Sequence, residues 1–236
     1  MNDFIALVTG ANKGIGKEIA RQLADAGCTV HVGSRDPERG RRAAAEIGGR
    51  ARPLVLDVTD PASIAAAAQQ VERLDILVNN AGILVDDRPP TEADVDSFRR
   101  TYETNLFGVI AVTNAFLPAL RASRRPRVVN ISSGTGSLAW STRGEHRGFT
   151  GTSAAYRSSK TALNAVSVYY AQALAEDGVK VNALAPGLRH TDLNPRAAAS
   201  DGDPAEAAAG AVRLALLPDD GPTGGFFSWD GTEVPW

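Results

Sequence analysis

The sequence predicts a three-layer α/β fold in which helices cover both faces of a doubly wound, seven-stranded parallel sheet. Short apolar runs alternate regularly with longer, alanine-rich runs, as expected for repeated strand–helix–strand units. Several apolar runs are continuous, which is typical of strands that are covered on both faces. The rhythm has no internal break or repeat, so we expect a single domain over residues 1–236.

The strands are expected where β-branched and other apolar residues cluster, and the helices where Ala and Leu dominate. The expected strands are 4–8, 29–33, 52–56, 75–79, 127–131, 180–184 and 225–228. The expected helices are 14–26, 37–47, 61–72, 91–122 (two helices or one bent helix), 156–177 and 204–217. Asp36, Asp60 and Asp203 each precede a proline and should cap the helices that follow. Gly27 and Gly178 should terminate helices.

Composition argues against several functional classes. A formal net charge of −2 gives no reason to expect nucleic acid or an acidic membrane as partner. No apolar run is long enough to span a membrane, and the chain enters its first strand without a basic leader. A single cysteine, Cys28, suits a cytoplasmic chain. The histidines (His31, His146 and His190) and Cys28 show no metal-ligand spacing, so we expect no metal.

A glycine-rich turn follows the first expected strand and runs directly into a helix. Its sequence is Thr9-Gly10-Ala11-Asn12-Lys13-Gly14-Ile15-Gly16. Glycines let the backbone approach a pyrophosphate, whose charge the helix N-terminus favours. With a second strand about 20 residues further on, this context predicts a dinucleotide cofactor.

The end of the second strand indicates which dinucleotide. An acid there would bind the ribose 2′-hydroxyl, whereas a cation would accommodate a 2′-phosphate. The acid position falls on Ser34, which Arg35 follows, and Lys13 can reach the same phosphate. Asp36 is the contrary feature, but it precedes a proline and fits a helix cap better. We therefore expect NADP(H).

Tyr156 and Lys160 form a Tyr-x-x-x-Lys pair at the start of a long expected helix. Residues four apart lie on the same helix face, so the phenol and the ammonium should be neighbours. A fixed cation favours the phenolate and lowers the phenol pKa, which makes the tyrosine a candidate proton donor or acceptor.

These motifs appear in the order found in the short-chain dehydrogenase/reductase family, which the chain resembles over essentially its whole length. The matching residues are the turn 9–16, Asp57-Val58, Asn79-Asn80-Ala81-Gly82, Asn105, Ser133, Tyr156-x-x-x-Lys160, and Pro186-Gly187 followed by Thr191. The Gly-Ala-Asn-Lys-Gly-Ile-Gly turn, Ser-Arg-Asp and the ending Val-Pro-Trp most resemble the NADPH-dependent carbonyl reductases and their plant menthone-reductase relatives.

The resemblance implies a Rossmann fold, with the cofactor-binding part over about 1–132 and the catalytic and substrate loops over about 133–236. Beyond the residues of the glycine turn, Ser34 and Arg35, the implied cofactor contacts are Asp57, Val58, Asn80, Ala81, Gly82, Tyr156, Lys160, Pro186, Gly187, Arg189 and Thr191. Asp57 and Val58 would contact the adenine, and the segment from Pro186 to Thr191 would hold the nicotinamide carboxamide.

The implied catalytic set is Asn105, Ser133, Tyr156 and Lys160. Tyr156 would act as the general acid in reduction, and Lys160 would lower its pKa and bind the nicotinamide ribose. Ser133 would hydrogen-bond the substrate carbonyl, and Asn105 would anchor a water that relays protons to Lys160. The rival to Ser133 is Ser132, which strand alternation places on the opposite face.

The implied function is NADPH-dependent hydride transfer to a ketone, aldehyde or quinone. The alternatives are an NADP-dependent alcohol dehydrogenase working oxidatively and a non-catalytic NADP(H) sensor, since fold does not fix function. Ser133 and Tyr156 would touch the small-molecule substrate, as would Trp140 and Leu188, with Phe149 and Trp229 as further candidates. The long 133–156 segment should lie near the face on which many relatives dimerise, and the sequence leaves monomer and homo-oligomer open.

Overall fold

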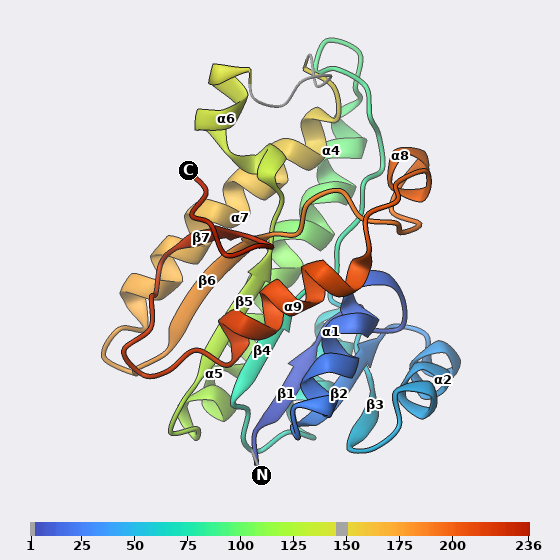
Figure 1. The fold of residues 1–236 in the computed structure, drawn as a ribbon. Coiled ribbons are helices and arrows are strands. Elements are labelled where there is room, and N and C mark those ends of the chain that lie inside the picture. Colours follow the sequence, from blue (N-terminus) through green and yellow to red (C-terminus); the bar gives the residue numbers. More distant parts are fainter. Residues whose placement is uncertain (1–2, 145–150) are drawn as a thin grey trace.

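The computed structural model describes residues 3–144 and 151–236, and it contains a seven-stranded sheet with helices on both faces (Figure 1). The strand order is β3-β2-β1-β4-β5-β6-β7, and every pairing between neighbouring strands of this sheet is parallel. The predicted doubly wound α/β fold is confirmed. Because the order reverses between β1 and β4, the carboxyl ends of these strands open a crevice where ligands bind in such sheets.

Each expected strand is present, with bounds that differ from the prediction by no more than one residue. The strands are β1 (Ile5–Val8), β2 (Thr29–Ser34), β3 (Ala51–Val55), β4 (Ile76–Asn79), β5 (Arg127–Ile131), β6 (Lys180–Ala185) and β7 (Phe226–Ser228).

The expected helices are also present, but two end early. They are α1 (Gly14–Asp25), α2 (Pro37–Ile47), α3 (Pro61–Ala68), α4 (Val95–Tyr102), α5 (Gly108–Arg121), α7 (Ala154–Ala173) and α9 (Pro204–Ala215). α3 and α7 each stop four residues before the predicted end. In α3 the amides of Gln70 and Val71 bond three residues back rather than four, so the chain tightens into a turn. A π-helical segment, η1 (Glu103–Phe107), joins α4 to α5.

Three short elements lie where the sequence indicated irregular loops. They are η2 (Gly134–Gly136), α6 (Leu138–Arg143) and α8 (Pro195–Ala198). Each is too short to show helical periodicity in the sequence. α6 begins where Ser137 accepts a hydrogen bond from the Trp140 amide, and α8 where Asn194 accepts one from the Ala197 amide.

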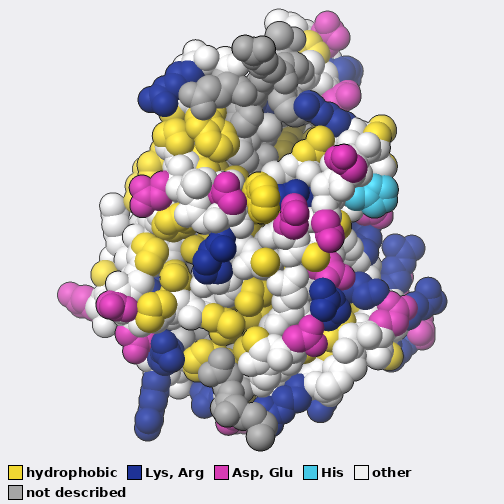
Figure 2. Space-filling view, in the orientation of Figure 1, with side chains coloured by type: hydrophobic (Ala, Val, Ile, Leu, Met, Phe, Trp, Pro, Cys, Tyr) yellow, Lys and Arg dark blue, Asp and Glu magenta, His cyan; other side chains and the backbone are white. Residues whose placement is uncertain are grey.

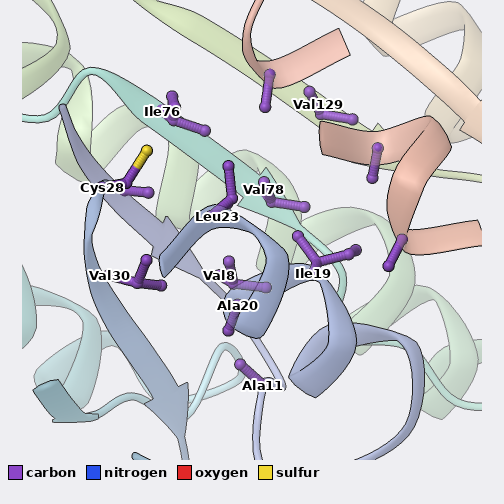
Figure 3. Close-up of a cluster of buried hydrophobic side chains, with 14 of the residues drawn as sticks. Val8, Ala11, Ile19, Ala20, Leu23, Cys28, Val30, Ile76, Val78 and Val129 are labelled. Carbon is purple, nitrogen blue, oxygen red and sulfur yellow. The ribbon is translucent and has the colours of Figure 1, made fainter. Parts of the chain in front are cut away.

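Alternate side chains of the strands enter two apolar layers. On one face they pack with α1, α2 and α9, and Figure 3 shows Ile19 and Leu23 of α1 beside Val8 and Val78. On the other face they pack with α3, α5 and α7 around Phe116, which is fully buried. Covering both faces removes most strand side chains from water, which explains the continuous apolar runs of the sequence.

The surface in Figure 2 carries basic, acidic and apolar side chains interspersed rather than a patch of one charge. Within the described residues, none of the helices is long and apolar enough to cross a membrane.

Candidate active site

One cleft of about 400 Å³ opens along the carboxyl ends of the strands. Most of the residues expected to bind the cofactor line it, and these are Gly10, Asn12, Lys13, Gly14, Ile15, Gly16, Ser34, Arg35, Asp57, Val58, Asn80, Ala81, Gly82, Tyr156, Lys160, Pro186 and Thr191. They come from six separate parts of the chain, which the switch in strand order brings together.

The glycine turn is shaped as a backbone cradle at the start of α1. Gly10 and Gly14 have φ values of 62° and 53°, and a Cβ on Gly16 would stand only 2.3 Å from Asn80 Nδ2. Asn80 Nδ2 also donates to the carbonyl oxygen of Thr9 at 2.9 Å, which fixes the turn to the end of β4. Only glycine satisfies these positions without strain or collision.

α1 lacks the side-chain cap that most of its neighbours have. Asp36, Asp60 and Asp203 accept first-turn amides of α2, α3 and α9, as predicted, whereas the N-cap of α1, Lys13, makes no side-chain cap hydrogen bond. The first-turn N–H groups and the helix dipole therefore face the cleft as an anion site. These residues fit the pyrophosphate of a dinucleotide.

The far end of the cleft carries cations. Arg35 is exposed there, and the Ser34 hydroxyl is buried and donates to the Asp36 carbonyl at 2.9 Å. Arg39, in the first turn of α2, also lines the cleft and was not predicted. Lys13 spans the mouth of the cleft to Asp192, with Nζ and Oδ2 2.6 Å apart.

At the other end, Tyr156 and Lys160 extend from the first turns of α7. Lys160 Nζ lies 5.7 Å from the centroid of the Tyr156 ring and donates to the carbonyl oxygen of Ile131 at 2.8 Å. Burial lowers the pKa of Lys160 to about 8. Burial raises the pKa of Tyr156, and its hydrogen bond with Ser133 acts in the opposite direction.

That Lys160 lowers the pKa of Tyr156 stays a prediction. In this structure the ammonium lies over the ring, and burial of the phenol outweighs its hydrogen bond with Ser133. A phenol with a raised pKa is fully protonated at neutral pH, so Tyr156 is set to donate a proton.

Asn105 lies in the π-helical segment η1, a type of helical irregularity often found at functional sites. Its Oδ1 accepts the Ile83 amide at 2.8 Å, and its Nδ2 donates to the Ile83 carbonyl and to Ser159 Oγ. A Cβ on Gly82 would stand 3.4 Å from Asn105 Oδ1 and 3.5 Å from Lys160 Nζ. Asn105 thus braces the cleft wall beside Lys160, and its water-relay role stays a prediction.

The two serines after β5 have different surroundings. The Ser132 hydroxyl is buried and donates to Asn164 Oδ1 at 2.5 Å. Ser133 is partly exposed, lies 2.9 Å from Thr135 Oγ1, and interacts with Tyr156. Ser132 lines the cleft and Ser133 does not, but the hydroxyl that interacts with Tyr156 belongs to Ser133, in agreement with the alternation argument.

Several expected contacts lie elsewhere. Arg189 does not line the cleft, because its side chain is turned toward Glu206 and the ring of Trp229. Gly187 and Leu188 also lie outside it, with Leu188 47% exposed.

The predicted aromatic contacts are likewise displaced. Trp140 packs partly buried against the cluster around Phe226 and Val234, and Trp229 lies under Arg189. His146 and Phe149 lie outside the described residues.

Within the described part of the chain, no group of three or more His, Cys, Asp or Glu could hold a metal ion.

Several residues that line the cleft were not predicted as contacts from the sequence: Asp36, Arg39, Leu56, Thr59, Ile83, Leu84, Thr104, Ile131, Ser132, Asp192 and Leu193. Arg39 could have been found, because it lies in the first turn of the expected helix that follows Arg35. Ile83, Leu84 and Leu193 give the cleft apolar walls, and no pattern in the sequence marked them.

Comparison with known proteins agrees with this geometry. The family described as short chain dehydrogenase matches residues 4–201, and the chain belongs to this family of oxidoreductases that act on carbonyl and alcohol groups. An NADPH-bound carbonyl reductase from chicken fatty liver superimposes with a TM-score of 0.85 at 26% identity, with 100% of each chain covered. Menthone neomenthol reductase from Mentha piperita gives a TM-score of 0.78 at 30% identity over 97% of this chain and 99% of that one. A 3-ketoacyl-(acyl-carrier-protein) reductase from Brucella melitensis, complexed with NADH, gives 0.82 at 25% identity over 95% and 96%. The predicted likeness to carbonyl and menthone reductases is confirmed.

Proposed function

We propose that this chain is an NADPH-dependent reductase of ketones, aldehydes or quinones. One observation carries the proposal: a single cleft joins the Tyr156 and Lys160 pair at one end to the cations Lys13 and Arg35 at the other. A dinucleotide laid along the glycine turn would place its nicotinamide by the pair and its 2′-phosphate by the cations.

The chain's own groups can perform the acid–base part of the reaction. When bound, NADPH supplies the hydride that reduces the carbonyl carbon. Tyr156 Oη gives its proton to the carbonyl oxygen as negative charge develops there, and the Ser133 hydroxyl donates a hydrogen bond to that oxygen. Lys160, cationic below a pKa of about 8, stabilises the phenolate that remains until it is reprotonated.

Burial keeps the Tyr156 phenol protonated, which is the form that donates a proton in carbonyl reduction. The apolar walls formed by Ile83, Leu84 and Leu193 suit a substrate whose carbonyl is attached to hydrocarbon groups.

The cations favour NADPH over NADH. Arg35, Arg39 and Lys13 all border the same end of the cleft, and phosphate binds to such groups through charge-assisted hydrogen bonds. Asp36, the acid that follows Arg35 in the sequence, is occupied as the cap of α2 and pairs with Arg39.

The test is consumption of NADPH and NADH with a panel of ketones, aldehydes and quinones, using Tyr156→Phe as the control. Turnover with NADPH that vanishes in the variant is the expected result. Tight NADPH binding without turnover, equal in both proteins, would instead indicate a cofactor sensor. A preference for NADH would overturn the roles given to Arg35 and Lys13.

A further inference from the structure

A buried arginine lies directly behind the wall of the cleft. Only 7% of the Arg189 side chain is exposed, and it stands three residues after Pro186, which borders the cleft. Its Nε donates to the Pro186 carbonyl oxygen at 2.8 Å, and its Nη1 pairs with Glu206 Oε2 of α9 at 2.8 Å. Its guanidinium carbon lies 4.3 Å from the centroid of the Trp229 ring.

The residues around the Arg189 side chain are closely packed. A Cβ on Gly187, whose φ is 72°, would stand 3.2 Å from Trp229 Cδ1 and 3.4 Å from Arg189 Nη2. A Cβ on Gly210 of α9 would stand 2.7 Å from the Trp229 carbonyl oxygen. The turn after β6, the tryptophan ring and α9 therefore form one packed unit, with the guanidinium at its centre.

The polar contacts show what this unit holds in place. Guanidinium is planar, so it can stack on the indole while donating in its own plane to two different elements. One of those donors holds the backbone of the cleft wall itself. In the described residues, Arg189 Nη2 is the one buried side-chain nitrogen or oxygen without a hydrogen-bond partner. A buried donor without a partner costs free energy, so its presence calls for an explanation.

We propose that Arg189 is a positioning residue for the nicotinamide end of the cofactor. By holding the Pro186 carbonyl against Trp229 and α9, it fixes the turn that leads to Thr191 and thereby the wall beside Tyr156. This inference rests on the proposed function, because it requires that a nicotinamide lie at this end of the cleft. It replaces the direct contact that the sequence indicated for Arg189 with an indirect one.

The experiment compares two ligands that share the adenosine end. NADPH reaches both ends of the cleft, whereas 2′,5′-ADP carries the 2′-phosphate but no nicotinamide. Arg189→Met keeps an unbranched side chain that can pack on Trp229 but removes every donor. The matched control is Arg213→Met, since Arg213 is an exposed arginine of α9 whose Nη2 donates to the Trp229 carbonyl at 2.9 Å.

For Arg189→Met we expect the Kd for NADPH to rise about tenfold and kcat to fall about tenfold, as for a misplaced reacting group. The Kd for 2′,5′-ADP should stay within about twofold of the wild-type value, and Arg213→Met should change none of these quantities by more than that. Glu206→Gln, at a half-exposed position, should shift NADPH binding in the same direction by less. If circular dichroism shows that Arg189→Met is unfolded, the Glu206→Gln variant is used to test the inference instead.

Unchanged NADPH binding and turnover in these variants, or equal loss of NADPH and 2′,5′-ADP, would overturn the inference while leaving the proposed function intact. A wild-type chain that binds neither NADPH nor NADH would overturn the proposed function, and the inference with it.

Discussion

The ammonium nitrogen of Lys160 lies 5.7 Å from the centroid of the Tyr156 ring, over its face rather than at its hydroxyl group. Burial moves the two pKa values apart, lowering that of Lys160 to about 8 and raising that of Tyr156. Each shift favours the neutral form of its group. In this pair the lysine is therefore the group whose charge changes close to physiological pH.

We expect the rate of carbonyl reduction to fall above about pH 8. Below that pH Lys160 is cationic and Tyr156 is protonated, which is the state that reduction needs. Above it the lysine loses its charge, and kcat should drop about tenfold per pH unit. The measurement is kcat at saturating NADPH and substrate from pH 6 to 10, with circular dichroism to verify folding. A rate that stays flat to pH 10 would contradict the role of Lys160.

Lys160→Met should abolish turnover and yet stabilise the fold at neutral pH. The folded-state pKa, about 8, lies below the ordinary lysine pKa of 10.5, so the unfolded chain binds more protons between these values. Wild-type stability therefore rises with pH across this window, and below pH 8 the full cost of burying the charge applies. Removing the amine should raise the free energy of unfolding by about 3 kcal/mol, the cost that corresponds to this pKa shift. Loss of the hydrogen bond to Ile131 should offset about 1 kcal/mol of that gain.

Urea unfolding of wild type and Lys160→Met at pH 7 and pH 9.5 measures this difference. The advantage of the variant should be about 2 kcal/mol at pH 7 and should shrink at pH 9.5. A variant that is less stable than wild type at pH 7 would mean that the buried ammonium is fully compensated by its surroundings.

Substituting the two serines after β5 separates catalysis from stability. Ser133→Ala removes a donor beside Tyr156, so kcat should fall about 10²- to 10³-fold with little change in the unfolding free energy. Ser132→Ala leaves Asn164 Oδ1 without the donor 2.5 Å away and should cost about 1–3 kcal/mol of stability. Steady-state kinetics and urea unfolding of both variants test the assignment. The reverse pattern would show that Ser132 is the catalytic serine.

Features of this fold that depend on residues close together in the chain were predicted from the sequence, and features that depend on distant residues were not. Strands and long helices were predicted because apolar periodicity extends over many residues, and Tyr156 and Lys160 because their spacing is local. α6 and α8 were missed because so few residues leave no periodicity to detect. Arg189 turns away from the cleft toward α9 and Trp229, and Asp192 pairs with Lys13 across the cleft. Because these partners are distant in sequence, no local pattern could reveal either position.

The Lys13–Asp192 ion pair should weaken NADPH binding. Its atoms lie 2.6 Å apart at the mouth of the cleft, and the 2′-phosphate would compete with Asp192 for the ammonium. Both side chains are well exposed, so Asp192→Asn should tighten NADPH binding only about two- to fivefold and leave NADH unchanged. Lys13→Met should weaken NADPH alone. Calorimetric titration of both cofactors tests this, with Arg41→Met, paired with Glu38 on α2, as the control. Equal effects on NADH and NADPH would place Lys13 away from the 2′-phosphate.

Gly16→Ala should damage the cofactor cradle through collision rather than backbone strain. The added Cβ would stand 2.3 Å from Asn80 Nδ2 and 2.7 Å from the Gly10 carbonyl oxygen, which forces the turn and the end of β4 apart. We expect a loss of about 1–3 kcal/mol in unfolding free energy and much weaker NADPH binding. Gly48→Ala is the control, because its φ is 72° but no atom lies within 4 Å of the new Cβ. It should cost about 1–2 kcal/mol and leave NADPH binding unchanged. Retention of wild-type NADPH affinity in Gly16→Ala would show that the pyrophosphate does not depend on this close approach.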